Sequence, residues 1–186
     1  MISNFYSREE LEEIGFKSIG ENVLISKKTS IYSSNKISIG NNVRIDDFCI
    51  LSGNITIGNN VHISAYVALY GKAGIEIKDY SGCSARSIIY SVTDDFSGQY
   101  MIGAVLPESV TNVRKEKVIL EKYSQLGANT IVMPGVNIGE GAVTGALSFV
   151  NNNLTPWSIN VGIPAKKIKD RKKEIKELVK KVENRI

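Results

Sequence analysis

The chain has 186 residues, of which 42% are hydrophobic and 23% are charged, and its formal net charge is +4. That length suits one folded domain with a sizeable core. No apolar run approaches the roughly 20 residues of a membrane-spanning helix, so membrane insertion is not expected. The first residues lack a basic region followed by an apolar core, and the chain has only two cysteines. We therefore predict a cytoplasmic protein without a secretory signal.

The N-terminal stretch predicts a short helix. Ser7 is followed three residues later by Glu10, just before the apolar residues Leu11 and Ile14. This is a capping-box pattern, in which a serine and a glutamate satisfy each other's backbone N–H groups at the start of a helix. We expect residues 1–18 to form a helical cap on the structure that follows.

An aliphatic residue recurs every six positions through most of the chain. The period fits neither an amphipathic helix nor a simple alternating strand, but it fits a triangular coil of short strands with three hexads per turn. We therefore predict a mainly β solenoid over residues 19–169, with the recurring residue pointing inward. The series is Ile19, Ile25, Ile31, Ile39, Ile45, Leu51, Ile57, Ile63, Leu69, Ile77, Cys83 and Ile89, then Leu120, Leu126, Val132, Ile138, Thr144 and Val150, with two-residue insertions before Ile39 and Ile77.

Three members of the predicted interior are not simple aliphatic residues. Cys49 and Cys83 fall at interior positions, where we expect small buried hydrophobic residues rather than a redox or metal site. Thr144 is the one clear polar residue in the aliphatic series, and the sequence offers no account of it.

The repeat breaks between Ile89 and Leu120. The inserted loop, residues 90–117, contains too many apolar side chains for a free linker, so we expect it to pack against something. A packed loop on a rigid stack is a common way to build one wall of a cleft. Two adjacent carboxylates, Asp94 and Asp95, stand near its start.

The C-terminal segment is basic and has helical spacing. Lys166 to Lys181 contains nine Lys or Arg residues against three Asp or Glu. No aromatic residues interleave with these charges, so a solvated helix face is favoured over nucleic-acid binding. We predict a helix over residues 170–186, packed on the prism or on a neighbouring subunit through its apolar stripe, namely Ile175, Leu178, Val179, Val182 and Ile186.

The hexads, the run LGANTIVMPGVNIG at 126–139 and the closing GIPAKKI at 162–168 resemble the hexapeptide-repeat acyltransferases. The resemblance covers about residues 19–170 and is strongest to galactoside O-acetyltransferases and nucleotide-amino-sugar N-acetyltransferases. It implies a left-handed parallel β-helix, a homotrimer with active sites in the clefts between subunits, and acetyl-CoA as the acyl donor.

The resemblance also implies where CoA binds. Small or short residues let the pantetheine arm approach the coil backbone, and the matching positions are Ala128, Ala146 and Asn151. Basic residues after the Gly-x-Pro-Ala turn contact the nucleotide phosphates. The corresponding residues are Lys166 and Lys169, with Lys167 nearby.

The catalytic histidine that the resemblance implies is missing. It would stand in a stretch like Ser-Val-Thr-x-His, and this chain has Asp95 at its position, beside Asp94. The only histidine, His62, lies on an earlier coil. Residues at the root of the loop are candidates for hydrogen bonds to sugar hydroxyls or a phosphate, namely Tyr90, Ser91, Thr93 and Arg86.

The missing histidine favours an amine acceptor. A hydroxyl must lose its proton as it attacks a thioester, which needs a base with a pKa near neutrality. A neutral amine is a competent nucleophile, and a carboxylate need only orient it or accept its proton. We therefore predict N-acetylation of a nucleotide-linked amino-deoxy sugar in surface polysaccharide or glycan biosynthesis, with O-acetylation of a sugar hydroxyl as the alternative.

Two other classes of β-helix protein are alternatives to an acyltransferase. A β-helix hydratase that holds zinc through three histidines is excluded by the single histidine, and no metal is expected. A non-catalytic scaffold is the remaining alternative, although a pure scaffold has no need of a small-residue track beside a basic turn.

Overall fold

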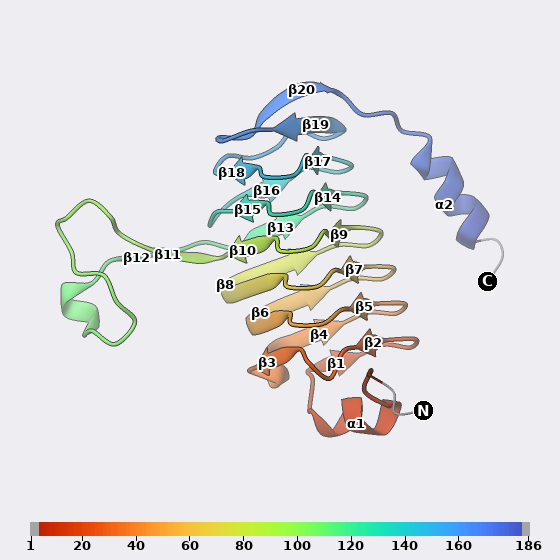
Figure 1. The fold of residues 1–186 in the computed structure, drawn as a ribbon, viewed down its shortest axis with the longest axis horizontal. Coiled ribbons are helices and arrows are strands. Elements are labelled where there is room, and N and C mark those ends of the chain that lie inside the picture. The colour runs from red at the N-terminus through yellow and green to blue at the C-terminus, as the bar shows by residue number, and fades with distance from the viewer. Residues whose placement is uncertain (1–3, 184–186) are drawn as a thin grey trace.

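Three columns of short parallel strands form a three-sided stack (Figure 1). The computed structural model describes residues 4–183. The first face contains β1 (Ser18–Ile19), β4 (Ile37–Ile39), the later halves of β6 (Ile50–Ile57) and β8 (Ala68–Ile77), β13 (Val118–Leu120) and β16 (Asn137–Ile138). The second contains β2 (Leu24–Ile25), β5 (Arg44–Ile45), β7 (His62–Ile63), β9 (Gly82–Cys83), β14 (Gln125–Leu126), β17 (Val143–Thr144) and β19 (Ser158–Val161). The third contains β3 (Ser30–Tyr32), the earlier halves of β6 and β8, β10 (Ile88–Tyr90), β15 (Ile131–Val132) and β18 (Phe149–Val150).

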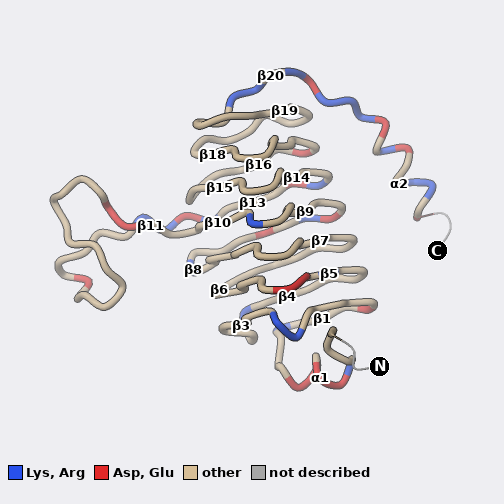
Figure 2. Tube along the Cα trace, viewed as in Figure 1, with Lys and Arg blue, Asp and Glu red and all other residues tan. Residues whose placement is uncertain are grey.

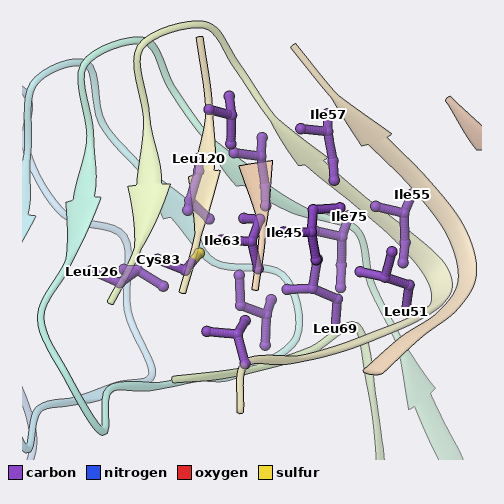
Figure 3. Close-up of a cluster of buried hydrophobic side chains, with 14 of the residues drawn as sticks. Ile45, Leu51, Ile55, Ile57, Ile63, Leu69, Ile75, Cys83, Leu120 and Leu126 are labelled. Atoms are coloured by element: carbon purple, nitrogen blue, oxygen red, sulfur yellow. The ribbon is translucent and has the colours of Figure 1, made fainter. Parts of the chain in front are cut away.

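The hexad series forms the core, as the period predicts. Each member pairs with the equivalent member one coil away, as Ile57 does with Ile39 and Ile77. Most members are fully buried, and Figure 3 shows them converging on the axis of the stack. The parallel β-helix of hexapeptide repeats is thereby confirmed.

The two cysteines lie in this core. Cys49 and Cys83 have no exposed surface and are unbonded to each other. Burial raises the pKa of the Cys83 thiol to about 12 and that of Cys49 to about 11. Both are therefore inert hydrophobic residues, as predicted.

Thr144 has a structural reason to be polar. Its hydroxyl accepts a hydrogen bond from the backbone N–H of Gly127 at 2.9 Å and lies 2.9 Å from the hydroxyl of Thr130. The next residue up the same column is Asn160, also buried and polar. The interior column of the second face thus changes from aliphatic to hydrogen-bonded near the C-terminal end of the stack.

The N-terminal helix caps the first coil as predicted. α1 (Arg8–Glu13) has a complete capping box, in which Ser7 accepts from the Glu10 N–H and the Glu10 carboxylate accepts from the Ser7 N–H at 2.7 Å. Leu11 is buried against the core.

The C-terminal prediction is wrong about where the helix begins. Lys166–Asp170 forms a strand, β20, antiparallel to β19, and the helix α2 spans only Ile175–Glu183. The reason is that β19 leaves an open edge at the top of the stack, and the chain that returns after the turn pairs with it. Ile186, the last residue of the predicted apolar stripe, lies outside the described residues.

The helix α2 runs back along the outside of the stack (Figure 1). Val179 is buried there, and Tyr80 donates a hydrogen bond to Glu183 at 3.0 Å. Lys176 pairs with Glu140 at 2.7 Å. Packing on the β-helix, one of the two predicted locations, is therefore observed. None of the described helices is long and apolar enough to cross a membrane.

All insertions into the repeat lie at one corner, between the third and first faces. The 3-10 turn η1 (Ser34–Lys36) occupies the first, residues 71–74 the second, and the long loop 90–117 the third. The long loop forms an arm that projects from the stack (Figure 1). It is built on a hairpin of β11 (Val92–Asp94) and β12 (Val113–Lys115) and contains the 3-10 turn η2 (Glu108–Val110).

We predict that Thr144→Val lowers the free energy of unfolding by about 1–3 kcal/mol, because the nearly isosteric side chain leaves the Gly127 N–H without its partner and removes one contact of the Thr130 hydroxyl. Urea unfolding followed by circular dichroism measures this. Thr56→Val, at an exposed threonine of the first face, is the matched control and should change stability little. Equal effects of both substitutions would contradict a stabilising role for the Thr144 hydrogen bonds.

Candidate active site

The root of the arm is anchored by Ser91. This residue is fully buried, and its hydroxyl donates to the Tyr70 carbonyl and accepts from the Ala73 N–H, both at 2.9 Å. Its backbone carbonyl accepts from the Glu116 N–H, which closes the base of the hairpin. The Ser91 hydroxyl thus anchors the arm, and its role as a substrate contact stays a prediction.

The hairpin carries Thr93 and Asp94 to the edge of a hollow of about 280 Å³, which we call the Asp94 hollow. Its other walls include Lys72 from the stack and Leu106 and Val113 from the arm. The carboxylate of Asp94 has no hydrogen-bond or ion-pair partner among residues 4–183. A carboxylate without a partner at the edge of a hollow is available to a cationic ligand group.

Asp95 is engaged in the arm itself. One carboxylate oxygen accepts from the Ser97 N–H at 2.7 Å and the other from the Asn112 side-chain amide at 2.9 Å. These hydrogen bonds from Ser97 and Asn112 lower the pKa of the Asp95 carboxyl. The two neighbouring aspartates line one hollow with Arg114 but differ in hydrogen bonding: Asp95 ties the two sides of the arm together, and Asp94 is unengaged.

Of the other predicted substrate residues, Tyr90 lies next to the arm and Arg86 lies at a different corner of the stack. Tyr90, just before the arm, stacks on Tyr70 with ring centroids 5.3 Å apart, and burial raises its pKa. Arg86 lies at the corner between the second and third faces, with its guanidinium 5.8 Å from the centre of the Tyr66 ring. Arg86 is thus separated from the arm by the width of the third face.

The predicted alanine track is a column at the corner between the second and third faces. Ala128 and Ala146 lie on successive coils, joined by the hydrogen bond from the Leu147 N–H to the Ala128 carbonyl at 2.8 Å. Ala85 occupies the same corner one coil earlier, beside Ser84. The Ser84 hydroxyl accepts from the Gln125 side-chain amide at 3.2 Å. Backbone with small side chains is therefore exposed along this corner.

The remaining predicted CoA residues lie at the end of the stack. Lys166, Lys167 and Lys169 are exposed on β20, and Lys167 pairs with Asp170 at 2.6 Å. Asn151 follows β18 at the corner from which the arm projects, one face away from the alanines. Figure 2 shows that basic residues are dense on β20 and the segment leading to α2.

The single histidine is remote from the arm. His62 lies on the second face, exposed, with its Nε2 atom 2.7 Å from a carboxylate oxygen of Asp46. Over the described part of the chain there is no group of three or more His, Cys, Asp or Glu residues that could hold a metal ion.

Most of the arm's apolar side chains do not pack on this chain. Phe96 is 76% exposed and Val105 is 95% exposed, and Tyr100, Met101 and Ile102 are also exposed. Most of the arm beyond its base is uncharged in Figure 2. The expectation that the arm packs against something is therefore not met within one chain.

Comparisons with known proteins agree with this architecture. Residues 36–71 match the family model described as bacterial transferase hexapeptide (six repeats). The chain is also similar to the galactoside acetyltransferase solved with coenzyme A, with a TM-score of 0.60 over 90% of this chain and 71% of the other, at 18% identity. That similarity supports the fold alone.

Two relatives match over nearly the whole length. One is the dTDP-4-amino-4,6-dideoxy-D-glucose acyltransferase of Escherichia coli, 46% identical over 91% of this chain and 90% of the relative. The other is AntD, an N-acyltransferase from Bacillus cereus. A structure of its S84C variant with dTDP-4-amino-4,6-dideoxyglucose and coenzyme A is 52% identical, covers all of both chains and has a TM-score of 0.98. The chain therefore belongs to the hexapeptide-repeat acyltransferases.

Proposed function

We propose that this protein transfers an acyl group from acyl-CoA to the 4-amino group of dTDP-4-amino-4,6-dideoxyglucose. The observation that carries the proposal is the full-length match to AntD, whose structures contain dTDP, that amino sugar or CoA. The reaction forms a C–N bond to the acyl carbon and breaks its C–S bond. CoA leaves as the thiol, and the amine gives up one proton.

The unengaged carboxylate fits an amine acceptor. Asp94 stands at a hollow with Thr93, and no imidazole is near it, because His62 lies on another face. A carboxylate attracts the ammonium form of the acceptor, orients the neutral amine and takes up the proton released on attack. A hydroxyl acceptor would need a base with a pKa near neutrality, and no imidazole lines this hollow, so O-acylation is the weaker candidate.

The two aspartates have different proposed roles. Asp94 is the residue that contacts the acceptor nitrogen, and Asp95 shapes the arm that carries it. Structures of AntD include its D94A and D94N variants, and this chain has Asp94 at the same number in an alignment that covers both chains almost completely. The sequence pattern left both aspartates as catalytic candidates, with Asp95 at the position of the family's histidine, because it could not show which carboxylate was engaged.

Ser84 is a further candidate that sequence reasoning missed. AntD was also studied with Ser84 substituted by Thr, Cys or Ala, and this chain has Ser84 too. Its hydroxyl lies beside the alanine column, where the thioester of a bound acyl-CoA would pass. We propose that Ser84 contacts the reacting groups there. Its position beside Ala85, in the coil below Ala128, is the signal that could have singled it out.

The donor binds along the alanine column in this proposal. The small side chains of Ala128 and Ala146 leave the backbone accessible to the pantetheine arm. Lys166 and Lys169 bind the phosphates of CoA. Acetyl is the acyl group that the family resemblance implies. AntD has been solved with 3-hydroxybutyryl-CoA, so a longer acyl group is the alternative to be tested.

The exposed arm supports a homotrimer. Its apolar side chains, including Phe96 and Val105, are largely exposed. Monomeric proteins rarely expose large groups of apolar side chains. A second copy of this chain would cover them, and it would close a cleft around Asp94 from the other side. The predicted site between subunits follows from this packing.

Acyl transfer is tested by CoA release with dTDP-4-amino-4,6-dideoxyglucose, using acetyl-CoA and 3-hydroxybutyryl-CoA in parallel. We expect turnover with at least one donor and none with the corresponding dTDP-6-deoxyglucose, which carries a hydroxyl in place of the amine. The same protein without acceptor controls for hydrolysis. Turnover of the hydroxyl sugar alone would contradict the N-acyltransferase assignment.

Substitution of the two aspartates separates their roles. We expect Asp94→Asn to lower kcat/KM about 100-fold or more, because the amide cannot accept the proton. Asp95→Asn should retain activity within about threefold, because asparagine still accepts the Ser97 N–H in the same turn. Steady-state kinetics measures both. A larger loss in Asp95→Asn than in Asp94→Asn would reverse the assignment.

The arm's role in assembly is tested by Val105→Asp. A charge on this side chain should weaken a trimer, so that the mass measured by light scattering falls from three times 20.4 kDa toward one. Val182→Asp is the control, because Val182 is half exposed on α2, on the other side of the stack from the arm in Figure 1. If Val105→Asp keeps the trimer while Val182→Asp breaks it, the interface lies elsewhere.

A further inference from the structure

A second hollow, of about 640 Å³, lies at the same corner of the stack as the arm. Its floor is the short corner at Ser52, Gly53 and Asn54. The coils on either side have the two-residue insertions, and these longer corners project beyond the short one. The hollow is therefore a product of the alternation of long, short and long corners in successive coils.

Three lysines line this hollow: Lys17 before the first strand, Lys36 from the first long corner and Lys72 from the second. No carboxylate is among its lining residues. We call it the lysine hollow.

The three lysines differ from their neighbours in having no counter-ion. Residues 17–122 contain nine lysines, and six of them have a carboxylate within 4 Å, namely Lys27, Lys28, Lys78, Lys115, Lys117 and Lys122. The other three are Lys17, Lys36 and Lys72, and among the residues that the structure describes none of them has an ion pair. All the unpaired lysines of this part of the chain therefore face one cavity.

The lysine hollow adjoins the Asp94 hollow. Lys72 lines both, because it projects from the long corner directly below the base of the arm. A ligand can therefore extend from the unpaired carboxylate to the unpaired ammonium groups along one corner of the stack. Such a ligand would carry a cationic group at one end and an anionic group at the other.

We propose that the lysine hollow binds the diphosphate of a nucleotide-linked amino sugar. The inference rests on the proposed function, and it extends that function by naming the residues that hold the acceptor's phosphates. In dTDP-4-amino-4,6-dideoxyglucose the diphosphate is attached at C1 and the amine at C4, so one pyranose ring separates them. Asp94 receives the amine and Lys72, Lys36 and Lys17 receive the diphosphate.

Electrostatics favours this occupant. Three ammonium groups around one hollow repel each other, and a diphosphate with two or more negative charges offsets that repulsion. Lysine contacts phosphate as a mobile point charge, which suits a flexible diphosphate. The basic residues that the sequence assigns to CoA lie on β20, at the other end of the stack. The two substrates would thus have separate phosphate sites.

The test compares Lys36→Gln/Lys72→Gln with the native full-length protein by calorimetry, using dTDP and CoA as probes. Both substitutions are at exposed side chains and should not disturb folding, which circular dichroism checks. We expect the affinity for dTDP to fall about tenfold or more and that for CoA to stay unchanged. The native affinity for dTDP should also decrease as salt is added, more steeply than that of the variant.

Lys28→Gln is the matched control, because it removes the same charge from a lysine paired with Asp47 at 2.8 Å. It should bind dTDP like the native protein. In kinetics, the double variant should raise KM for the nucleotide sugar while kcat changes little.

Three results would overturn the inference. If the native protein acylates the amino sugar and the double variant binds dTDP equally well, the lysine hollow is not the diphosphate site, and the proposed function stands. If the double variant loses affinity for CoA but not for dTDP, the hollow belongs to the donor. If the native protein neither binds dTDP nor acylates the amino sugar, the proposed function fails and this inference fails with it.

Discussion

Backbone hydrogen bonding between successive coils is the constraint on which the rest of this structure depends. Each strand pairs in parallel with the equivalent strand one coil away, as Ile57 pairs with Ile39 and Ile77. In such a ladder a residue that points inward lies over another that points inward. A side chain at one hexad position is therefore buried in every coil, at about 1.5–3 kcal/mol for each isoleucine or leucine. Extra residues have no place inside and must leave the stack at a corner.

That constraint gathers the candidate functional features at one edge. The two short insertions and the long arm all lie between the third and first faces. The rigid coils hold the root of the arm through buried Ser91, and the two longer corners create the lysine hollow beside it. Strand pairing keeps the stack regular, and the insertions into the six-residue period carry the candidate functional residues.

Charge pairing distinguishes structural from candidate functional groups here. Asp95 has both carboxylate oxygens engaged, and most lysines of the stack have a carboxylate partner. Asp94 and the three lysines of the lysine hollow have no such partner, and they lie along the same corner. An unpaired charge contributes little to folding but leaves its full interaction available to a ligand. These four unpaired charges thus outline the proposed acceptor site.

The sequence by itself determined the solenoid, its core residues and the place where the arm leaves, because a strict six-residue period allows only one inward face per strand. Its resemblance to the hexapeptide-repeat acyltransferases implied acyl transfer, and the absence of a histidine at the family's catalytic position favoured an amine acceptor. Only the tertiary structure decided which aspartate is unengaged, why Thr144 is polar, and that Lys166–Asp170 is a strand. Those outcomes depend on partners distant in sequence, such as Asn112 for Asp95 and Gly127 for Thr144. The lysine hollow was also decided only by the tertiary structure, because Lys17, Lys36 and Lys72 become neighbours only when coils of unequal corner length are stacked.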